Sequence, residues 1–376
     1  MTNQLYDLPS SQSIDILTFS RLLDDTTNSY KFVFLLSFLD LLSSQFFKSS
    51  SPILLKDLAV EMLVNAWYPH SVFRLSFGLQ DMITKNLDSL DLHLEQSFLK
   101  ITESNKSVLR NAVRGKDISD ELVRYVPFRL IRPFFKELRG LKDQQVNHQI
   151  KLLAELLFES RKPLYKFDQN STSITIHPEW ALYIQNNYRI IRGWVAWGWL
   201  QYMQKNNPNT PALANKLFPP RERESLQNQT LYWETVIKEY SNLSCIYSGQ
   251  RLTLDDISLD HYLPWSFVAH NQLWNLVPIP KRVNSSKSDR IPSNIYFEKF
   301  IEIQHLGLMV FHNYNAGKKW NIYTESFIVD LGFSDKSELL NLERLKAQYK
   351  LKIKPLIALA ASQGFENDWI YIGLTH

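Results

Sequence analysis

The sequence predicts a mostly α-helical α+β protein, with a helical N-terminal domain and a small module of two strands and a helix towards the C-terminus. Segments with helical apolar periodicity make up most of the chain. Runs of strand character are few and short, at residues 164–167, 173–177, 245–247 and 257–263. With 376 residues and 44% hydrophobic content, the chain is large enough to bury a sizeable core and is not a disordered protein.

Residues 1–160 have the character of an α-helical domain. The run YKFVFLLSFLDLL is apolar almost all round, so we expect a buried helix from Tyr30. Pro52 and Pro69 bracket a second helix at 54–67. Weaker patterns predict helices at 78–90, 94–101, 106–113 and 143–160. The sequence leaves open whether this domain is a scaffold or serves in sensing and partner binding.

Three arginines lie among aromatic residues in the run RYVPFRLIRPFF, at Arg124, Arg129 and Arg132. Such interleaving can bind nucleic acid through charge and stacking. It is also typical of arginines whose stems pack on the edge of a core while their charged heads stay in water. Both interpretations remain open at this point.

Residues 161–240 combine a predicted hairpin with long helices. Strands at 164–167 and 173–177 flank a turn, and a Trp-rich helix is expected at 179–205. The run NNPNTP ends that helix. A further helix at 226–240 leads into the next segment.

Residues 241–300 hold the polar residues that indicate a reaction. Asp260 and His261 lie in the strand predicted at 257–263, and Asn275 lies in the following loop. Pro278 and Pro280 are expected to stop any further strand. A short basic helix then places Asn284 between Lys281 and Lys287 at i, i+3 and i+6, roughly on one face.

This combination suits the cleavage of a phosphodiester, which needs an activated water, a base and a cation. His is the one side chain whose ordinary pKa suits the base near neutral pH. A carboxylate and an amide oxygen are hard ligands that suit Mg²⁺. Neighbouring residues of a regular strand point to opposite faces, so Asp260 and His261 share one site only if the strand end is distorted or the phosphate lies along its edge.

The motif DH, then P-x-S-F, then N, then N-x-x-K-S-D-x-x-P resembles the HNH (ββα-metal) endonucleases, and its spacing is most similar to the HNH domain of the RNA-guided CRISPR nucleases. The resemblance implies that His261 is the general base and that Asn275 braces the loop that orients it. It implies that Asp260 and Asn284 bind Mg²⁺ or Mn²⁺. The expected nucleic-acid contacts are Lys281, Lys287 and Arg290.

The sequence departs from the HNH proteins that bind a structural zinc through two C-x-x-C pairs. Its single cysteine, Cys245, excludes a Cys₄ site, so we expect no structural zinc and a small buried side chain at this position. Apolar packing must hold the module instead. The expected packing residues are Tyr247, Leu252, Trp265, Phe267 and Trp274.

Residues 301–376 are predicted to be a C-terminal helical region. A helix is expected at 296–304, and a basic amphipathic helix within 338–363 is expected to be kinked or split at Pro355. No apolar run reaches membrane-spanning length and no signal peptide is evident, so the sequence favours a cytoplasmic protein. No P-loop is present, so any ATP hydrolysis belongs to a partner protein.

The expected function is a Mg²⁺-dependent endonuclease that cuts DNA. By analogy with the family, a free-standing HNH protein of this length is similar to bacterial restriction or anti-phage effectors, in which an ATPase or sensor partner and an oligomer are possible. The alternatives left open are an RNA-cleaving toxin, a homing or mobile-element nuclease, and a non-catalytic nucleic-acid-binding subunit. The net charge of +4 fits a nucleic-acid binder without showing one.

Overall fold

The computed structural model describes residues 8–24, 26–78, 81–90, 92, 102–116, 121–141, 143–218, 224–315 and 317–373. The chain forms two compact units. Unit 1 comprises Met1–Asn209 and Lys216–Arg221, and unit 2 comprises Thr210–Asn215 and Glu222–His376. The predicted 1–160 domain and most of the 161–240 segment therefore belong to one unit, while the predicted 241–300 and 301–376 segments share the other.

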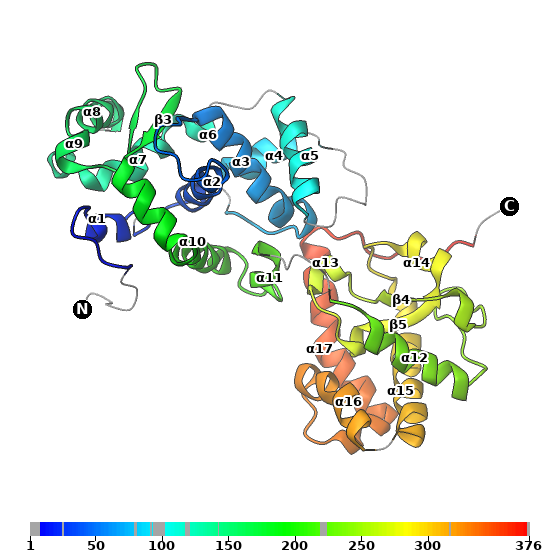
Figure 1. Cartoon of the computed structure of the whole chain (residues 1–376). Helices are drawn as coiled ribbons and strands as arrows, with labels where there is room; N and C mark the ends of the chain where they lie inside the picture. Colours follow the sequence, from blue (N-terminus) through cyan, green and yellow to red (C-terminus); the bar gives the residue numbers. More distant parts are fainter. Residues whose placement is uncertain are drawn as a thin grey trace. The chain divides into compact units, whose positions relative to one another are not determined.

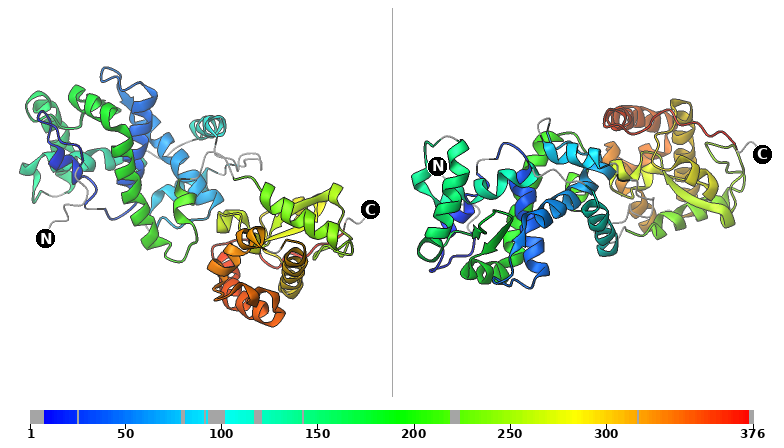
Figure 2. Two further views of the ribbon diagram at one scale, coloured as in Figure 1. Left: turned by 60° about the horizontal axis from the view of Figure 1, so that its bottom comes forward. Right: turned by 90° about the horizontal axis from the view of Figure 1, so that it is seen from above.

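Unit 1 is a helical body around three long helices. α2 (Tyr30–Ser44) is flanked by α3 (Leu55–Trp67) and α10 (Pro178–Asn206), as the views of Figures 1 and 2 both show. Both faces of α2 are covered, which is why its sequence is apolar almost all round. The predictions of a buried helix from Tyr30 and of a helix at 54–67 are confirmed. The remaining helices of the unit are α1 (Ile16–Ser20), α4 (Met82–Ser89), α5 (Glu103–Arg114), α6 (Glu121–Arg124), α7 (Val126–Ile131), α8 (Asp143–Leu156) and α9 (Phe158–Arg161), with short turns η2 (Tyr68–Val72), η4 (Arg132–Phe134) and η5 (Lys136–Leu138).

A small antiparallel sheet lies in the same unit. The predicted hairpin is confirmed as β2 (Tyr165–Phe167) and β3 (Ser173–Ile176), and β1 (Ile53–Leu54) adds a third strand in the order β1-β3-β2. Two residues of β1 are too few to leave a strand pattern in the sequence. The helix predicted at 94–101 lies outside the described residues.

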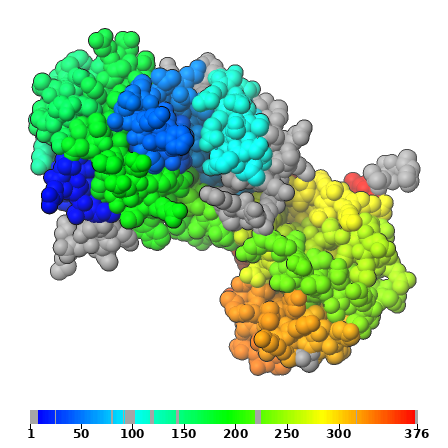
Figure 3. Space-filling view, viewed as in Figure 1, coloured from blue at the N-terminus to red at the C-terminus, as the bar shows by residue number. Residues whose placement is uncertain are grey.

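Unit 2 combines one two-stranded sheet with helices. β4 (Ile257–His261) pairs antiparallel with β5 (Leu276–Pro280), and α14 (Lys281–Lys287) follows directly; we call residues 257–287 the ββα module. Figure 3 shows the module, in yellow, beside α15 and α16, in orange. The other elements are α11 (Leu213–Leu217), which crosses the boundary between the units, and α12 (Gln227–Glu239), η6 (Leu254–Asp256), α13 (Trp265–Val268), η7 (Leu273–Asn275), η8 (Asn294–Tyr296), α15 (Phe297–Tyr314), α16 (Lys318–Leu331), η9 (Lys336–Leu340) and α17 (Leu342–Ser362).

Three local predictions in unit 2 are wrong. Pro278 and Pro280 do not stop the strand but lie in β5, opposite Leu259 and Ile257. β5 has a ladder on one side only, and prolines are tolerated where their missing N–H faces away from it. The run 245–247 is a turn rather than a strand, closed by a hydrogen bond from Gly249 N to Cys245 O of 2.9 Å. Of the two outcomes expected at Pro355, a kink or a split, the split is wrong, because α17 continues through Pro355 with buried residues on both sides, Ile353 and Ala360.

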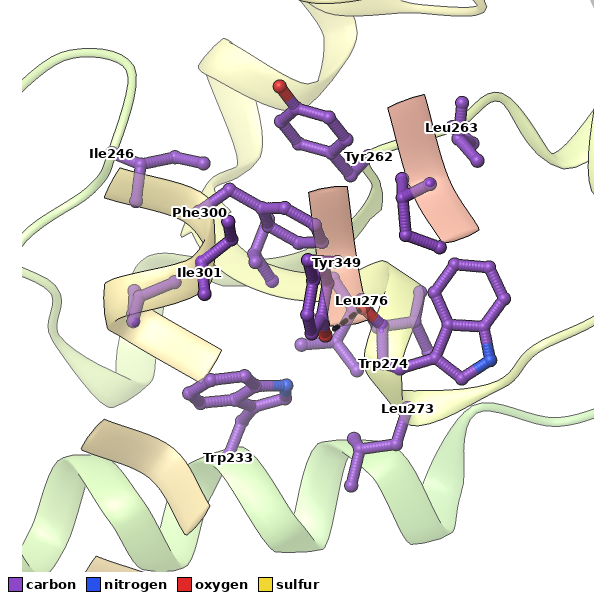
Figure 4. Close-up of a cluster of buried hydrophobic side chains, with 14 of the residues drawn as sticks. Trp233, Ile246, Tyr262, Leu263, Leu273, Trp274, Leu276, Phe300, Ile301 and Tyr349 are labelled. Carbon is purple, nitrogen blue, oxygen red and sulfur yellow. Dashed lines mark hydrogen bonds between the residues drawn. The ribbon is translucent and has the colours of Figure 1, made fainter. Parts of the chain in front are cut away.

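The core of unit 2 joins the ββα module to helices from the rest of the unit. Phe300 and Ile301 of α15 and Tyr349 of α17 pack around Leu276 of β5 (Figure 4). The Tyr349 hydroxyl also donates a 2.8 Å hydrogen bond to the Trp274 carbonyl, drawn as a dashed line in the same figure. The module is therefore a layer of a larger apolar core rather than an isolated fold.

The expected packing residues of the module are mostly in this core. Tyr247, Leu252, Phe267 and Trp274 are buried, as is Cys245, while Trp265 is partly exposed. The Tyr247 ring packs edge-on against Tyr296 and Trp369, and all three lie outside residues 257–287. The predicted fold class, mostly α-helical with a small ββα module in the C-terminal part, is confirmed. No helix within the described residues combines the length and the apolar character that a membrane span needs.

Candidate active site

His261 is the last residue of β4 and stands at the end of the two-stranded ladder, opposite Leu276. Its side chain is partly buried. The neighbouring Asp260 is only 2% exposed and points to the other side of the strand, into the unit. A regular strand thus places the two side chains on opposite faces of β4.

The ring of His261 is held by a residue that the sequence did not single out. Nε2 lies 3.0 Å from Oδ1 of Asn271, and the amide nitrogen of Asn271 donates to the Glu224 carbonyl at 3.0 Å. The second contact fixes which end of the amide faces the ring. Because an amide oxygen only accepts hydrogen bonds, Nε2 must carry the hydrogen. In the neutral ring Nδ1 therefore has the lone pair that can take a proton.

Replacing Asn271 tests this assignment. In Asn271→Ala the ring loses its acceptor, and we expect slower cleavage, by about 10–100-fold, which is typical of an orienting partner. In Asn271→Asp a carboxylate faces Nε2–H and stabilises the charged imidazolium, which raises the pKa of His261. The acidic limb of the pH–rate profile should then move to higher pH. An unchanged profile in Asn271→Asp would contradict the assignment.

Asn275 holds the loop that follows His261. Its Oδ1 accepts from Leu263 N at 2.8 Å, and its Nδ2 donates to Leu263 O at 2.9 Å. Its own carbonyl accepts from Tyr262 N at 2.8 Å, so three hydrogen bonds join Asn275 to the two residues after His261. The side chain is fully buried. These contacts are the ones that a bracing role needs.

Asp260 is the centre of a buried polar cluster. Its Oδ1 accepts from Lys287 Nζ at 2.9 Å and its Oδ2 from the Tyr247 hydroxyl at 2.9 Å. Burial raises the pKa of the Asp260 carboxyl, and the Lys287 ammonium and the Tyr247 hydroxyl oppose that rise. Lys287 Nζ also donates to the His261 carbonyl at 2.8 Å. The lysine thereby ties α14 to both residues of the Asp-His pair.

The three cations predicted to contact nucleic acid have different surroundings. The Lys287 side chain is fully buried, so in this structure its partner is Asp260 and not a surface ligand. Arg290 donates through Nε to the Lys287 carbonyl at 3.2 Å and forms a 3.7 Å ion pair with Glu366. Lys281 is exposed, with Nζ 3.1 Å from the Asp255 carbonyl. Helical spacing therefore predicted one shared face for Lys281 and Lys287. The two side chains differ in burial, since Lys287 is buried and Lys281 is exposed.

Asn284 lies one turn before Lys287 on α14 and is partly buried. Its Nδ2 donates to Ser258 Oγ at 2.9 Å and is 3.4 Å from the Leu259 carbonyl. These contacts from two consecutive residues of β4 settle the orientation of the amide. They keep the nitrogen on the strand and leave the amide oxygen as the end that can bind a cation.

The donors of this site fit a hard divalent cation in their chemistry. Asp260 supplies a carboxylate and Asn284 an amide oxygen, from the adjoining elements β4 and α14. Each oxygen of Asp260 receives one hydrogen bond in the structure, and a carboxylate oxygen has a second lone pair. Within the described residues no three His, Cys, Asp or Glu side chains cluster as a complete metal site, so a cation here would take further ligands from water and substrate.

Three contributors were missed in the sequence: Asn271, Tyr247 and Ser258. Each acts through a partner at least ten residues away, His261, Asp260 and Asn284 respectively. Tyr247 was expected only as a packing residue. No sequence spacing predicts such contacts. The positions of these side chains depend on how the loop between β4 and β5 and the turn at 245–249 fold.

Comparison with known proteins agrees with this geometry. Residues 245–293 match a family described as HNH endonuclease, and the match spans β4, β5 and α14. The chain therefore carries an HNH endonuclease domain in unit 2, and the predicted resemblance to HNH nucleases is confirmed. HNH nucleases generally use a divalent metal ion. No curated protein and no solved structure matches the chain.

Proposed function

We propose that the protein is a divalent-metal-dependent endonuclease that hydrolyses phosphodiester bonds in DNA through its HNH domain. The observation that carries the proposal is the match of residues 245–293 to an HNH endonuclease family, a segment that includes the Asp-His pair at the end of β4. The 3.0 Å contact between His261 Nε2 and Asn271 Oδ1 supports His261 as the oriented base, with Nε2 as the donor. Asp260 and Asn284 supply a carboxylate and an amide oxygen from β4 and α14.

In this proposal each residue has a separate task. His261 Nδ1 takes the proton of the attacking water, and Asn275 keeps the loop after His261 in place. Asp260 and Asn284 would hold the cation, with Mg²⁺ or Mn²⁺ as the expected ions. The chemistry that a bound divalent cation supplies is stabilisation of negative charge on the phosphate and on the leaving oxygen. Lys287 positions Asp260 and the His261 backbone, a revision of the phosphate contact expected from the sequence.

We further propose that the nuclease is the effector of a bacterial restriction or anti-phage system, with an ATPase or sensor as a possible partner. This proposal rests on the analogy at family level, which fits a single HNH domain attached to a separate helical unit. One such active site cuts one strand in each engagement. A double-strand break would therefore need a dimer or two successive cuts.

The substrate class is tested by incubating the purified protein with supercoiled plasmid, linear duplex DNA, single-stranded DNA and RNA, each with Mg²⁺, Mn²⁺ or EDTA. We expect plasmid nicking and linearisation with Mg²⁺ or Mn²⁺ and intact DNA in EDTA. We also expect no tightly bound zinc in the purified protein. Cleavage confined to RNA would replace the DNA assignment with the RNA-cleaving alternative, and cleavage of none of the substrates would favour the non-catalytic one.

A further inference from the structure

A second candidate site lies in unit 1, in the helical part that the HNH domain does not include. A cavity of about 1020 Å³ is formed by the segment after α1, the start of α2, and the α6–η5 region. Its volume is at the upper end of the range of small-molecule sites, about 300–1,000 Å³. Every described residue that lines it belongs to unit 1.

The lining of this cavity is strongly cationic. Among the described residues that line it, seven are basic and two, Asp24 and Glu121, are acidic; the basic ones are Arg21, Lys31, Arg124, Arg129, Arg132, Lys136 and Arg139. Like charges held together repel, which favours an anionic ligand that neutralises them.

Several of these cations form no ion pair with the part of the chain that the structure describes. Arg21, Arg124, Lys136 and Arg139 are exposed and form no ion pair with any residue that the structure describes. They come from different elements, so their heads can approach one ligand from several directions. Guanidinium groups are well suited to phosphate because they donate two parallel hydrogen bonds.

An aromatic ring lies among the cations. Tyr125 lines the cavity and is 43% exposed, and the guanidinium carbons of Arg124 and Arg129 lie 5.1 Å from its ring centroid. The ring and the two guanidinium groups lying over it form one planar cluster, and both guanidinium planes and aromatic rings can pack against a nucleotide base. The arginines of the RYVPFRLIRPFF run thus have their charged heads at a concave site rather than dispersed over the surface.

We propose that this cavity binds a nucleotide through its phosphates, with the base packed against the cluster of Tyr125, Arg124 and Arg129. The ligand chemistry has two possible sources, a free nucleotide and the end of a nucleic-acid strand. The proposal does not depend on catalysis by the HNH domain, since the residues belong to another unit. It gives unit 1 a ligand-binding role instead of a purely structural one.

The test is isothermal titration calorimetry on the full chain in EDTA, so that cleavage does not interfere. The probes are ATP, inorganic triphosphate, adenosine and a 5′-phosphorylated deoxyhexanucleotide. The variants are Arg124→Glu, Arg139→Glu and Tyr125→Leu, and the control is Arg189→Glu, an exposed arginine of α10 outside the cavity. Thermal unfolding of each variant checks that it is folded.

We expect ATP or the hexanucleotide to bind, and Arg124→Glu and Arg139→Glu each to weaken binding at least about tenfold, the effect of losing a charged hydrogen bond. Arg189→Glu should bind as the wild type does. Tyr125→Leu should weaken ATP more than triphosphate. Binding of ATP assigns a free nucleotide, and binding of the hexanucleotide alone assigns a strand end. The proposal is overturned if neither binds, if adenosine binds as tightly as ATP, or if Arg189→Glu weakens binding as much as Arg124→Glu.

Discussion

Replacing His261 with alanine is expected to abolish DNA cleavage while the protein stays folded and still binds DNA. The imidazole is the group that takes the proton of the attacking water, and general-base catalysis of this kind contributes about 10²–10⁴-fold. The loss should be larger than that of Asn271→Ala, which removes only the partner of the ring. The measurement is the initial rate of plasmid nicking under saturating Mg²⁺.

A matched control is available in the same unit. His312→Ala removes the same side chain from α15, where it packs against Trp320 far along the chain from the ββα module. This variant should nick plasmid at close to the wild-type rate. If His261→Ala retained similar turnover, His261 would not be the base.

Replacing Lys287 with methionine is expected to destabilise unit 2. The change leaves the buried Asp260 carboxylate without its cation, and breaking a buried ion pair costs about 3–5 kcal/mol. The double variant Lys287→Met/Asp260→Asn removes both charges and should recover much of that loss. Urea unfolding followed by tryptophan fluorescence measures the difference.

Lys281→Met is the control, since Lys281 is an exposed lysine of the same helix. Its unfolding should change by no more than about 0.5 kcal/mol, as for most surface substitutions. If Lys287→Met unfolded at the wild-type urea concentration and lost only DNA cleavage, the lysine would act on the substrate phosphate, as the sequence motif alone suggests.

The helices of unit 1 and the strand of the Asp-His pair were predictable because local sequence determines them. The apolar character of α2 and the Pro52 and Pro69 boundaries of α3 are strong local signals. β5 was missed because prolines usually end strands, and only the three-dimensional pairing shows that this strand has a free edge. A local sequence pattern does not indicate whether a strand has one edge without a neighbouring strand.

The sequence named candidate site residues but not their environments. The spacing of the motif singled out Asp260, His261, Asn275 and Asn284, and the structure places them on β4, η7 and α14 of one domain. The motif spacing did not show that Lys287 is buried. Helical spacing predicts which residues share a face of a helix, but not whether each of them is buried or exposed. Asn271 was out of reach for a different reason: its role depends on how the loop from α13 to β5 folds back onto His261.

The most direct test of the proposed site is a metal titration of plasmid nicking by wild type, Asp260→Ala, Asn284→Ala and Asn275→Ala. The account predicts no nicking in EDTA. It predicts that Asp260→Ala loses nearly all activity and needs more metal for what remains. Asn284→Ala should also shift the metal midpoint, whereas Asn284→Asp keeps an oxygen ligand and should retain residual cutting. Asn275→Ala should lower the rate about 10–100-fold at an unchanged midpoint. Wild-type nicking that persists in EDTA, or a midpoint shifted by Asn275→Ala and not by Asn284→Ala, would contradict the account.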